Sequence, residues 1–258
     1  MWSRRGWRVW ANRLFVSHPR LGQWGYDALR VTRLSRSARG VTPFLKALRA
    51  RGFRPQTILD VGANYGEWSR LAQGVFPQAR FYLIEPQVEM MPFLDNFCAT
   101  APGSRRFLAG AAAQSGTRAL TLWEDYQGSS FGPAESAEFL QQDRQRLLPV
   151  IAVDDLIAQG QMPIPDLVKI DVQGLELDVL QGATRCLGQS ELFVLEASWL
   201  TAPGETTFTT LLNFMEAHGY ALYDFLDFKR RPYDGALAQA DVAFARQDGW
   251  LRREQRWD

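Results

Sequence analysis

The stretch TILDVGANYGEWSRLAQGVF at residues 57–76 decides the fold. It begins with the apolar run TILDV (57–61), typical of a buried strand, and passes directly into the glycine-bearing turn GANYG (62–66). The next apolar residues recur at helical spacing: Trp68, Leu71, Ala72, Val75 and Phe76. A strand that runs through such a turn into an amphipathic helix predicts one unit of a parallel α/β sheet.

The same alternation of strand and helix continues along the chain. Further strands are predicted at 81–84, 107–109, 167–170 and 192–195, with helices after the first, third and fourth of them. This pattern predicts a doubly wound, mostly parallel, Rossmann-like α/β sheet with helices on both faces. The last two strands, 221–228 and 241–246, have no helix between them, so we expect them to pair antiparallel at an edge.

Residues 117–150 interrupt the alternation. RALTLWED (118–125) predicts an extra strand, GSSFG (128–132) a loop, and AESAEFLQQDRQR (134–146) a polar helix. An insertion of this kind is where substrate contacts are expected, with Ser129 and Ser130 as candidate hydrogen-bonding residues.

The first part of the chain has a different composition. Residues 1–54 contain 13 Arg and Lys against the single acid Asp27, whereas the whole chain has 29 basic and 28 acidic residues, so the remainder is net negative. We therefore predict a basic, Trp-rich extension over 1–54, with a short helix at 41–51, and a catalytic domain over 55–258. The extension could contact an anionic membrane surface, nucleic acid or the acidic body of the protein.

The composition also limits where the protein can be located and what it can bind. No apolar stretch approaches the roughly 18 residues of a spanning helix, and Arg8, Asn12 and Arg13 interrupt any signal-like segment, so the chain is expected to be cytoplasmic. A negative body disfavours a nucleic-acid substrate, because only the extension could contact the phosphates. A homo-oligomer is compatible with this composition.

The turn after the first strand contains an acid and two glycines, in the pattern Asp60-x-Gly62-x-Asn64-x-Gly66. Glycine and asparagine permit left-handed backbone and a close ligand approach. Glu85, at the tip of the next strand, could accept hydrogen bonds from both hydroxyls of a ribose. Asp60 would repel the diphosphate of a dinucleotide, so S-adenosylmethionine is favoured over NAD. A purely structural turn is the third alternative.

Four segments resemble the FkbM-type methyltransferases. They are LDVGANYGEWS (59–69), FYLIEP (81–86), VKIDVQGLELDVLQGA (168–183) and FVLEAS (193–198), and the third is the most specific. The resemblance covers residues 55–246 and implies a class I methyltransferase fold with S-adenosylmethionine as cofactor. It also implies O-methylation of a small-molecule hydroxyl, on a sugar or another natural product.

The resemblance assigns cofactor contacts by position. Asp60, Gly62, Ala63, Asn64 and Gly66 would hold the methionine end, Glu85 and Pro86 the ribose, and Ala111 and Ala112 the adenine. The stretch GAAAQSG (110–116) departs from the family, where an acidic or Asn residue is common among these positions.

Two carboxylates are predicted to face the crevice at the ends of neighbouring strands. Asp171 could be the base that removes the acceptor's proton, or Asp171 and Glu196 together could hold a Mg²⁺ ion. The structural alternative is that Asp171 caps a helix and Glu196 pairs with an Arg. Lys169 lies on the same strand face as Asp171 and could steady a carboxylate.

The segment RRPYDGALAQAD (230–241) predicts a loop over the active face, with Arg231, Tyr233 and Asp234 as candidate substrate contacts. The sequence therefore favours a methyltransferase acting on a hydroxylated metabolite. The alternative from another class is a non-catalytic cofactor-binding protein that is tethered to a membrane or partner by its basic extension.

Overall fold

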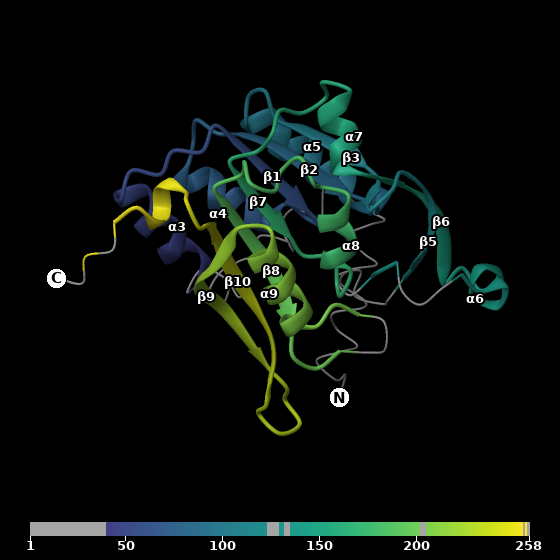
Figure 1. Ribbon diagram of the computed structural model, residues 1–258. Helices are drawn as coiled ribbons and strands as arrows, with labels where there is room; N and C mark the ends of the chain where they lie inside the picture. Colours follow the sequence, from purple (N-terminus) through teal and green to yellow (C-terminus); the bar gives the residue numbers. More distant parts are fainter. Residues whose placement is uncertain (1–39, 123–128, 132–134, 202–204, 255, 257–258) are drawn as a thin grey trace, which may run out of the picture.

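The computed structural model (Figure 1) describes residues 40–122, 129–131, 135–201, 205–254 and 256. Residues 1–39, which form most of the predicted basic extension, lie outside these ranges, as do residues 123–128 and 132–134 of the predicted insertion.

A seven-stranded sheet in the order β3-β2-β1-β7-β8-β10-β9 forms the centre of the molecule. Its strands are β1 (Thr57–Val61), β2 (Arg80–Glu85), β3 (Arg105–Leu108), β7 (Leu167–Ile170), β8 (Leu192–Ser198), β9 (Tyr220–Arg230) and β10 (Leu237–Arg246). The pairs among β3, β2, β1, β7 and β8 are all parallel, whereas β10 pairs antiparallel with both β8 and β9. The predicted doubly wound, mostly parallel sheet with an antiparallel pair at one edge is confirmed.

Two hydrophobic layers cover the sheet, one on each face. Alternate strand residues such as Ile58 and Leu59 belong to different layers, because successive strand side chains point to opposite faces. The first layer includes residues of α3 (Val41–Ala50), α4 (Glu67–Val75) and α5 (Met91–Thr100). The second includes residues of α7 (Val153–Ala158), α8 (Glu176–Gln181) and α9 (Phe208–Ala217).

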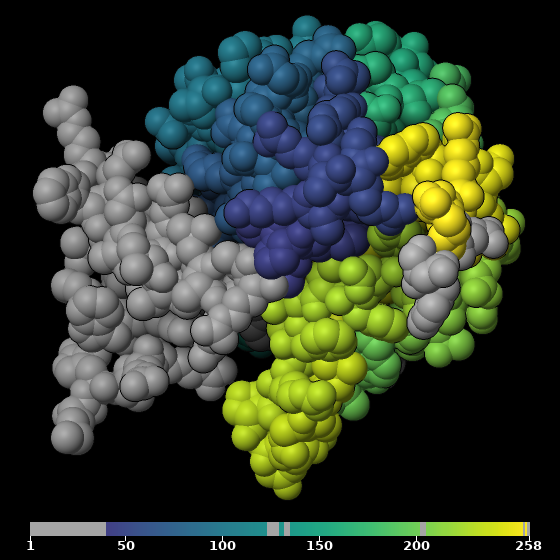
Figure 2. All heavy atoms as spheres, turned by 90° about the vertical axis from the view of Figure 1, so that its left-hand side faces the viewer, coloured from purple at the N-terminus to yellow at the C-terminus, as the bar shows by residue number. Residues whose placement is uncertain are grey.

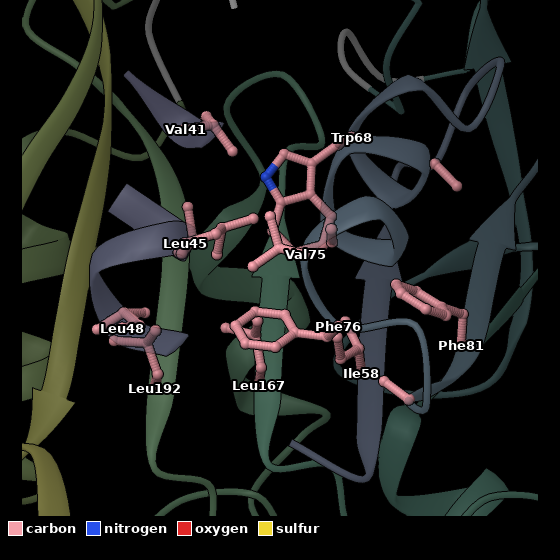
Figure 3. Packing of buried hydrophobic residues seen from close by; sticks show 14 of the residues in the cluster. Val41, Leu45, Leu48, Ile58, Trp68, Val75, Phe76, Phe81, Leu167 and Leu192 are labelled. Atoms are coloured by element: carbon pink, nitrogen blue, oxygen red, sulfur yellow. The ribbon is translucent and has the colours of Figure 1, made fainter. Parts of the chain in front are cut away.

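Helix α3 packs directly on the sheet. Leu45 and Leu48 contact the first layer beside Leu192, and both are almost completely buried (Figure 3). At its start, a Cβ atom on Gly40 would lie 2.9 Å from the backbone nitrogen of Asp227, so the chain approaches β9 closely there. The short helix predicted at 41–51 is confirmed, and it contributes to the core although it precedes the domain boundary predicted at residue 55.

The insertion forms a second, three-stranded sheet in the order β4-β6-β5. Its strands are β4 (Gly110–Ala111), β5 (Gly116–Thr121) and β6 (Gln145–Ile151). The predicted extra strand is therefore found in β5.

The polar helix predicted over 134–146 was too long. Helix α6 covers only Ala137–Gln141, and β6 begins at Gln145. Asp143 adopts a positive φ of 53°, which ends the helix, and the Gln145 side chain donates to Thr121 Oγ1 at 3.0 Å. Pairing of β6 with β5 thus overrides the local helical preference.

The helix predicted through Leu187 also ends early, at Gln181. The next residue, Gly182, lies so close to the turn after β4 that a Cβ atom would be 2.1 Å from the carbonyl oxygen of Ala112. The Asp154 carboxylate then accepts hydrogen bonds from the backbone N–H groups of Thr184 and Arg185 at 3.0 and 2.8 Å. These side-chain bonds replace the helical ones, so the chain continues in turns.

No helix in the described part of the chain is long and apolar enough to cross a membrane.

The packing of α3 predicts the effect of a core substitution. Leu45 is fully buried, so Leu45→Ala should lower the free energy of unfolding by about 2–5 kcal/mol, as large-to-small core changes do. Denaturant unfolding checks this, with the exposed neighbour Lys46→Ala as the control, expected to change it by less than about 0.5 kcal/mol. Equal effects of the two variants would mean that α3 is not part of the folding unit.

Candidate active site

Buried charged side chains gather where the parallel strands end. Asp60 on β1, Lys169 on β7 and Glu196 on β8 are exposed by only 0%, 5% and 3%. Their positions in the strands place them on the face covered by α3, α4 and α5. Because ligands of such sheets bind beyond the carboxyl ends of the strands, this edge is the candidate active site.

The turn between β1 and α4 is shaped by three residues with positive φ: Gly62 (74°), Asn64 (49°) and Gly66 (75°). A Cβ atom on Gly62 would lie 1.9 Å from the carbonyl oxygen of Asp171, so only glycine fits there. The backbone N–H groups of Gly62 and Ala63 donate to the carbonyl oxygen of Ile84 at 3.0 and 3.2 Å. The turn is therefore held against the end of β2 by these hydrogen bonds and against the residue that follows β7 by the close approach to Asp171.

Asp60 lies beneath this turn. Its Oδ2 accepts a hydrogen bond from the Ser69 hydroxyl at 2.6 Å, and its Oδ1 is 3.3 Å from Lys169 Nζ. That Oδ1 is buried without a hydrogen bond among the residues that the structure describes, so it keeps accepting capacity. The predicted contact of Asp60 with the methionine end of a cofactor stays a prediction.

Lys169 joins the two sides of the crevice. Its ammonium group donates to the carbonyl oxygen of Gly62 at 3.3 Å and lies 3.6 Å from Asp171 Oδ2. Burial disfavours the charged form, but the neighbouring carboxylates of Asp60 and Asp171 outweigh burial and raise the pKa of Lys169. The expectation that Lys169 steadies a carboxylate is confirmed by these contacts.

Glu85 ends β2 and supports the turn from the other side. Its Oε2 accepts from the Asn64 backbone N–H at 2.8 Å, and its Oε1 accepts from the Gln87 backbone N–H at 3.0 Å. Burial raises the pKa of Glu85 to about 7, although these hydrogen bonds act to lower it. The Gln87 side-chain amide also donates to Oε1, at 3.2 Å. A carboxylate has about four lone-pair sites, so about one site of Glu85 remains for its predicted ribose contact.

The predicted adenine-binding residues lie beside Glu85. The Ala109 backbone N–H donates to the carbonyl oxygen of Glu85 at 3.2 Å, and Ala111 and Ala112 follow in and after β4. Both side chains are buried. Pro86, also predicted at the cofactor, is half-buried at the start of the turn after β2.

Asp171 and Glu196 are bridged by one side chain. Gln173 Nε2 donates to Asp171 Oδ1 at 2.8 Å and to Glu196 Oε2 at 2.9 Å, and Lys229 Nζ lies 2.7 Å from Glu196 Oε1. Asp241 of β10 stands directly opposite Glu196 in the sheet register. The structure therefore brings together the two predicted catalytic carboxylates, and their catalytic roles stay predictions.

The two carboxylates differ in access and in charge. The Asp171 side chain is 29% exposed, whereas that of Glu196 is 1% exposed. Burial would raise the pKa of Asp171, but the ammonium groups of Lys169 and Lys229 outweigh it and lower that pKa. Burial, followed by repulsion from Asp171, raises the pKa of Glu196 well above its usual range. Asp171 is thus the ionised and accessible member of the pair.

The loop that presents Asp171 is held by Glu176. Gln173 and Gly174 have positive φ angles of 59° and 97°, and Glu176 Oε1 accepts from the backbone N–H groups of Val172 and Gly174, both at 3.1 Å. Glu176 is 2% exposed, and burial raises its pKa to about 7. The specific segment VKIDVQGLELDVLQGA therefore encodes a rigid loop as well as a polar site.

The donor set at Asp171 and Glu196 fits ammonium and amide partners better than Mg²⁺. Within the described residues, no three His, Cys, Asp or Glu side chains are grouped so that they could hold a metal ion. The nearest cationic neighbours, Lys229 Nζ at 2.7 Å from Glu196 and Lys169 Nζ at 3.6 Å from Asp171, already supply positive charge.

The predicted substrate residues lie in the loop beside β5 and in the turn between β9 and β10. Ser130 pairs with Thr121 in an isolated bridge, next to Ser129. Arg231 forms an ion pair with Asp234 in the turn between β9 and β10, and Tyr233 there is 91% exposed. The roles of these residues in substrate binding stay predictions.

Residues that the sequence did not single out complete the network, namely Gln173, Lys229 and Asp241. Lys229 reaches Glu196 across β10, a relation that depends on strand register and on the bulges between β9 and β10.

Comparisons with known proteins agree with this geometry. The family model described as the methyltransferase FkbM domain matches residues 60–222. Hexuronic acid methyltransferase AglP of Haloferax volcanii is 25% identical over 177 residues, which are 67% of this chain and 68% of that protein.

Solved structures of methyltransferases are also similar. A methyltransferase FkbM from Methylobacillus flagellatus aligns with a TM-score of 0.48 and 18% identity over 75% of this chain and 46% of that one, so this chain spans less than half of its length. Precorrin-6y C5,15-methyltransferase from Geobacter metallireducens aligns with a TM-score of 0.46 and 16% identity, over 79% of this chain and 86% of that chain.

The raised pKa of Glu176 predicts a pH-dependent stability. Between its usual value of 4.5 and about 7, folded Glu176 keeps a proton that the unfolded chain has released, so its contribution to stability is lost as the pH rises through this window. Glu176→Gln removes this titration. The free energy of unfolding should therefore fall between pH 5 and pH 8 by about 2–3 kcal/mol less in the variant than in the wild type. Thermal and denaturant unfolding across this range measure it, and parallel curves for both proteins would contradict the assignment.

Proposed function

This chain belongs to the FkbM methyltransferase family, and we propose that it transfers a methyl group from S-adenosylmethionine to a hydroxyl of a sugar that carries a carboxylate. Its seven-stranded sheet with one antiparallel strand is the class I methyltransferase fold expected from the sequence. The observation that carries the proposal is the accessible Asp171 carboxylate, held by Gln173 and Lys169 at the carboxyl edge of the sheet.

The residues around the turn after β1 fit such a cofactor. Gly62 and Gly66 let the backbone approach a ligand, and Glu85 keeps about one accepting site for a ribose hydroxyl. Asp60, ion-paired with Lys169 at 3.3 Å beneath the turn, supplies negative charge for the amino group at the methionine end. When bound, S-adenosylmethionine supplies an electrophilic methyl group on a sulfonium.

Asp171 is assigned the role of general base. A sugar hydroxyl has a high pKa, so its proton must leave as the oxygen forms the new bond to carbon and the carbon–sulfur bond breaks. Asp171 Oδ2 is accessible for that proton, while Oδ1 is held by Gln173. Glu196 is enclosed and acts through Gln173, so it is a positioning residue rather than a catalytic one.

Lys229 supports the choice of an acidic sugar. Its side chain is 55% exposed, and one of its three N–H donors is used by Glu196. The other donors are available to a substrate carboxylate beside Asp171. The similarity to a hexuronic acid methyltransferase points to the same class of acceptor.

Replacing one oxygen of Glu85 should weaken cofactor binding. Glu85→Gln keeps the size of the side chain but replaces an acceptor by a donor, so the Kd for S-adenosylhomocysteine should rise about tenfold. Isothermal titration calorimetry measures this, with Glu89→Gln on the adjoining turn as the matched control. Unchanged affinity in a folded Glu85→Gln variant would show that the cofactor does not bind at Glu85.

Removing the base should slow methyl transfer without loss of cofactor binding. Asp171→Asn keeps the hydrogen bond geometry of the loop but cannot accept the proton, so kcat should fall by about 10²–10⁴ while the Kd for S-adenosylhomocysteine changes little. The assay is mass-spectrometric detection of a methylated glucuronic or galacturonic acid acceptor. Asp178→Asn, in the same segment but paired with Arg118, is the control. Full activity of Asp171→Asn would exclude Asp171 as the base.

A further inference from the structure

A pocket of about 340 Å³ opens between the carboxyl ends of α3 and α4. Figure 2 views the molecule from the side on which α3 lies, with that helix drawn in purple. The described residues that line the pocket are Lys46, Arg49, Ala50, Arg54, Gly74 and Val75. We call it the basic pocket, because three of these residues are cationic and none is acidic.

The basic pocket lies at the edge of the sheet opposite to the candidate active site. Helix α4 begins beyond the carboxyl end of β1 and ends at Val75, shortly before β2 begins at Arg80. A crossover of this kind returns the chain to the amino edge of a parallel sheet. The pocket is therefore distinct from the crevice around Asp60, Lys169 and Asp171.

Backbone carbonyl groups hold two arginines of the basic pocket in place. Arg49 Nη1 donates to the carbonyl oxygen of Val75 at 2.6 Å. Arg54 Nη1 donates to the carbonyl oxygen of Phe53 at 2.9 Å and to that of Arg49. The bonds to Val75 and Arg49 offset the partial negative charge of the two helix ends, which would otherwise repel an anion. A guanidinium has five N–H donors, so each arginine keeps donors for a ligand.

The elements that form the basic pocket do not offset its positive charge. Helix α3 has no acidic residue, and the one acid of α4 is Glu67, in its first turn. Lys46 makes no hydrogen bond or ion pair with the residues that the structure describes. Lys46 and Arg49 are one turn apart on α3, and like charges at this spacing repel each other. A bound anion would relieve this repulsion.

The donors of the basic pocket indicate the class of anion. Arginine presents planar pairs of N–H donors that match the oxygens of a phosphate group, and lysine adds a compact point charge. The volume of about 340 Å³ is near the lower end of the range for small-molecule sites. We propose that the basic pocket binds a phosphate or diphosphate group, which a soluble metabolite or a lipid headgroup would carry. This binding does not depend on methyl transfer, so each can be tested without the other.

Gly74 allows the charge of the pocket to be changed without a steric clash. It is exposed in the last turn of α4, and a Cβ atom added to it would meet no other atom within 4 Å. Because glycine is a poor helix former, a longer side chain should not destabilise α4. Gly74→Glu should weaken the binding of inorganic pyrophosphate at least about tenfold, because it brings a negative charge to the pocket. Gly74→Lys should strengthen this binding, and the uncharged Gly74→Gln should fall between the two.

Isothermal titration calorimetry of the full chain with inorganic pyrophosphate measures this, at low ionic strength and without divalent cations. Wild type should bind pyrophosphate saturably, and Lys46→Gln should weaken the binding roughly threefold or more. The matched control is Thr209→Glu, which adds the same charge at an exposed position of α9, a helix on the other face of the sheet. Its Kd should stay within about twofold of the wild-type value, because screening limits the reach of a distant charge. Thermal unfolding without pyrophosphate shows that each variant is folded.

Vesicles distinguish the two sources of the phosphate group. If a lipid headgroup carries it, Gly74→Glu should also reduce co-sedimentation with phosphatidylcholine vesicles that contain phosphatidic acid, and Thr209→Glu should not. If a soluble metabolite carries it, Gly74→Glu should weaken only the binding of pyrophosphate.

Three results would overturn the proposal. They are no saturable binding of pyrophosphate to the wild type, equal affinity of the three Gly74 variants, or a loss in Thr209→Glu equal to that in Gly74→Glu. The second would show that the anion binds elsewhere on the chain, and the third that the overall charge of the protein governs its binding.

Discussion

The buried ammonium group of Lys169 holds the candidate site together. It lies 3.3 Å from Asp60 on β1 and 3.6 Å from Asp171 after β7, so one charge links the cofactor turn to the proposed base. An isolated buried lysine would be costly, and so would either carboxylate alone, which makes each of the three groups depend on the others. Gly62 can approach the Asp171 carbonyl oxygen because glycine has no Cβ atom, which would lie 1.9 Å from that oxygen.

The same charges separate the roles of two neighbouring carboxylates. Lys169 and Lys229 keep the pKa of Asp171 low although it is partly buried, whereas burial and repulsion from Asp171 raise the pKa of Glu196. Gln173, held in a left-handed conformation, donates to both and fixes their spacing. A protein can in this way present one ionised carboxylate to a substrate and enclose the other.

Local chemistry made the parallel sheet and the glycine turn predictable from the sequence. Strand runs, helical spacing and the residues that tolerate positive φ are all set within a few positions, as in the turn at Gly62, Asn64 and Gly66. Relations that cross the sheet were not predictable. Lys229 contacts Glu196 across β10, and this contact depends on the irregular register between β9 and β10. The last residues of the predicted polar helix form the start of β6 instead, because β6 pairs with β5.

A crystal structure with S-adenosylhomocysteine tests the central claim most directly, that the Lys169-centred charges define the cofactor crevice. We expect a ribose hydroxyl within hydrogen-bonding distance of Glu85, the sulfur facing Asp171, and the Lys169 contacts to Asp60 and Asp171 intact. A ligand bound away from the turn after β1, or a Lys169 ammonium group turned out of contact with Asp60, would contradict it.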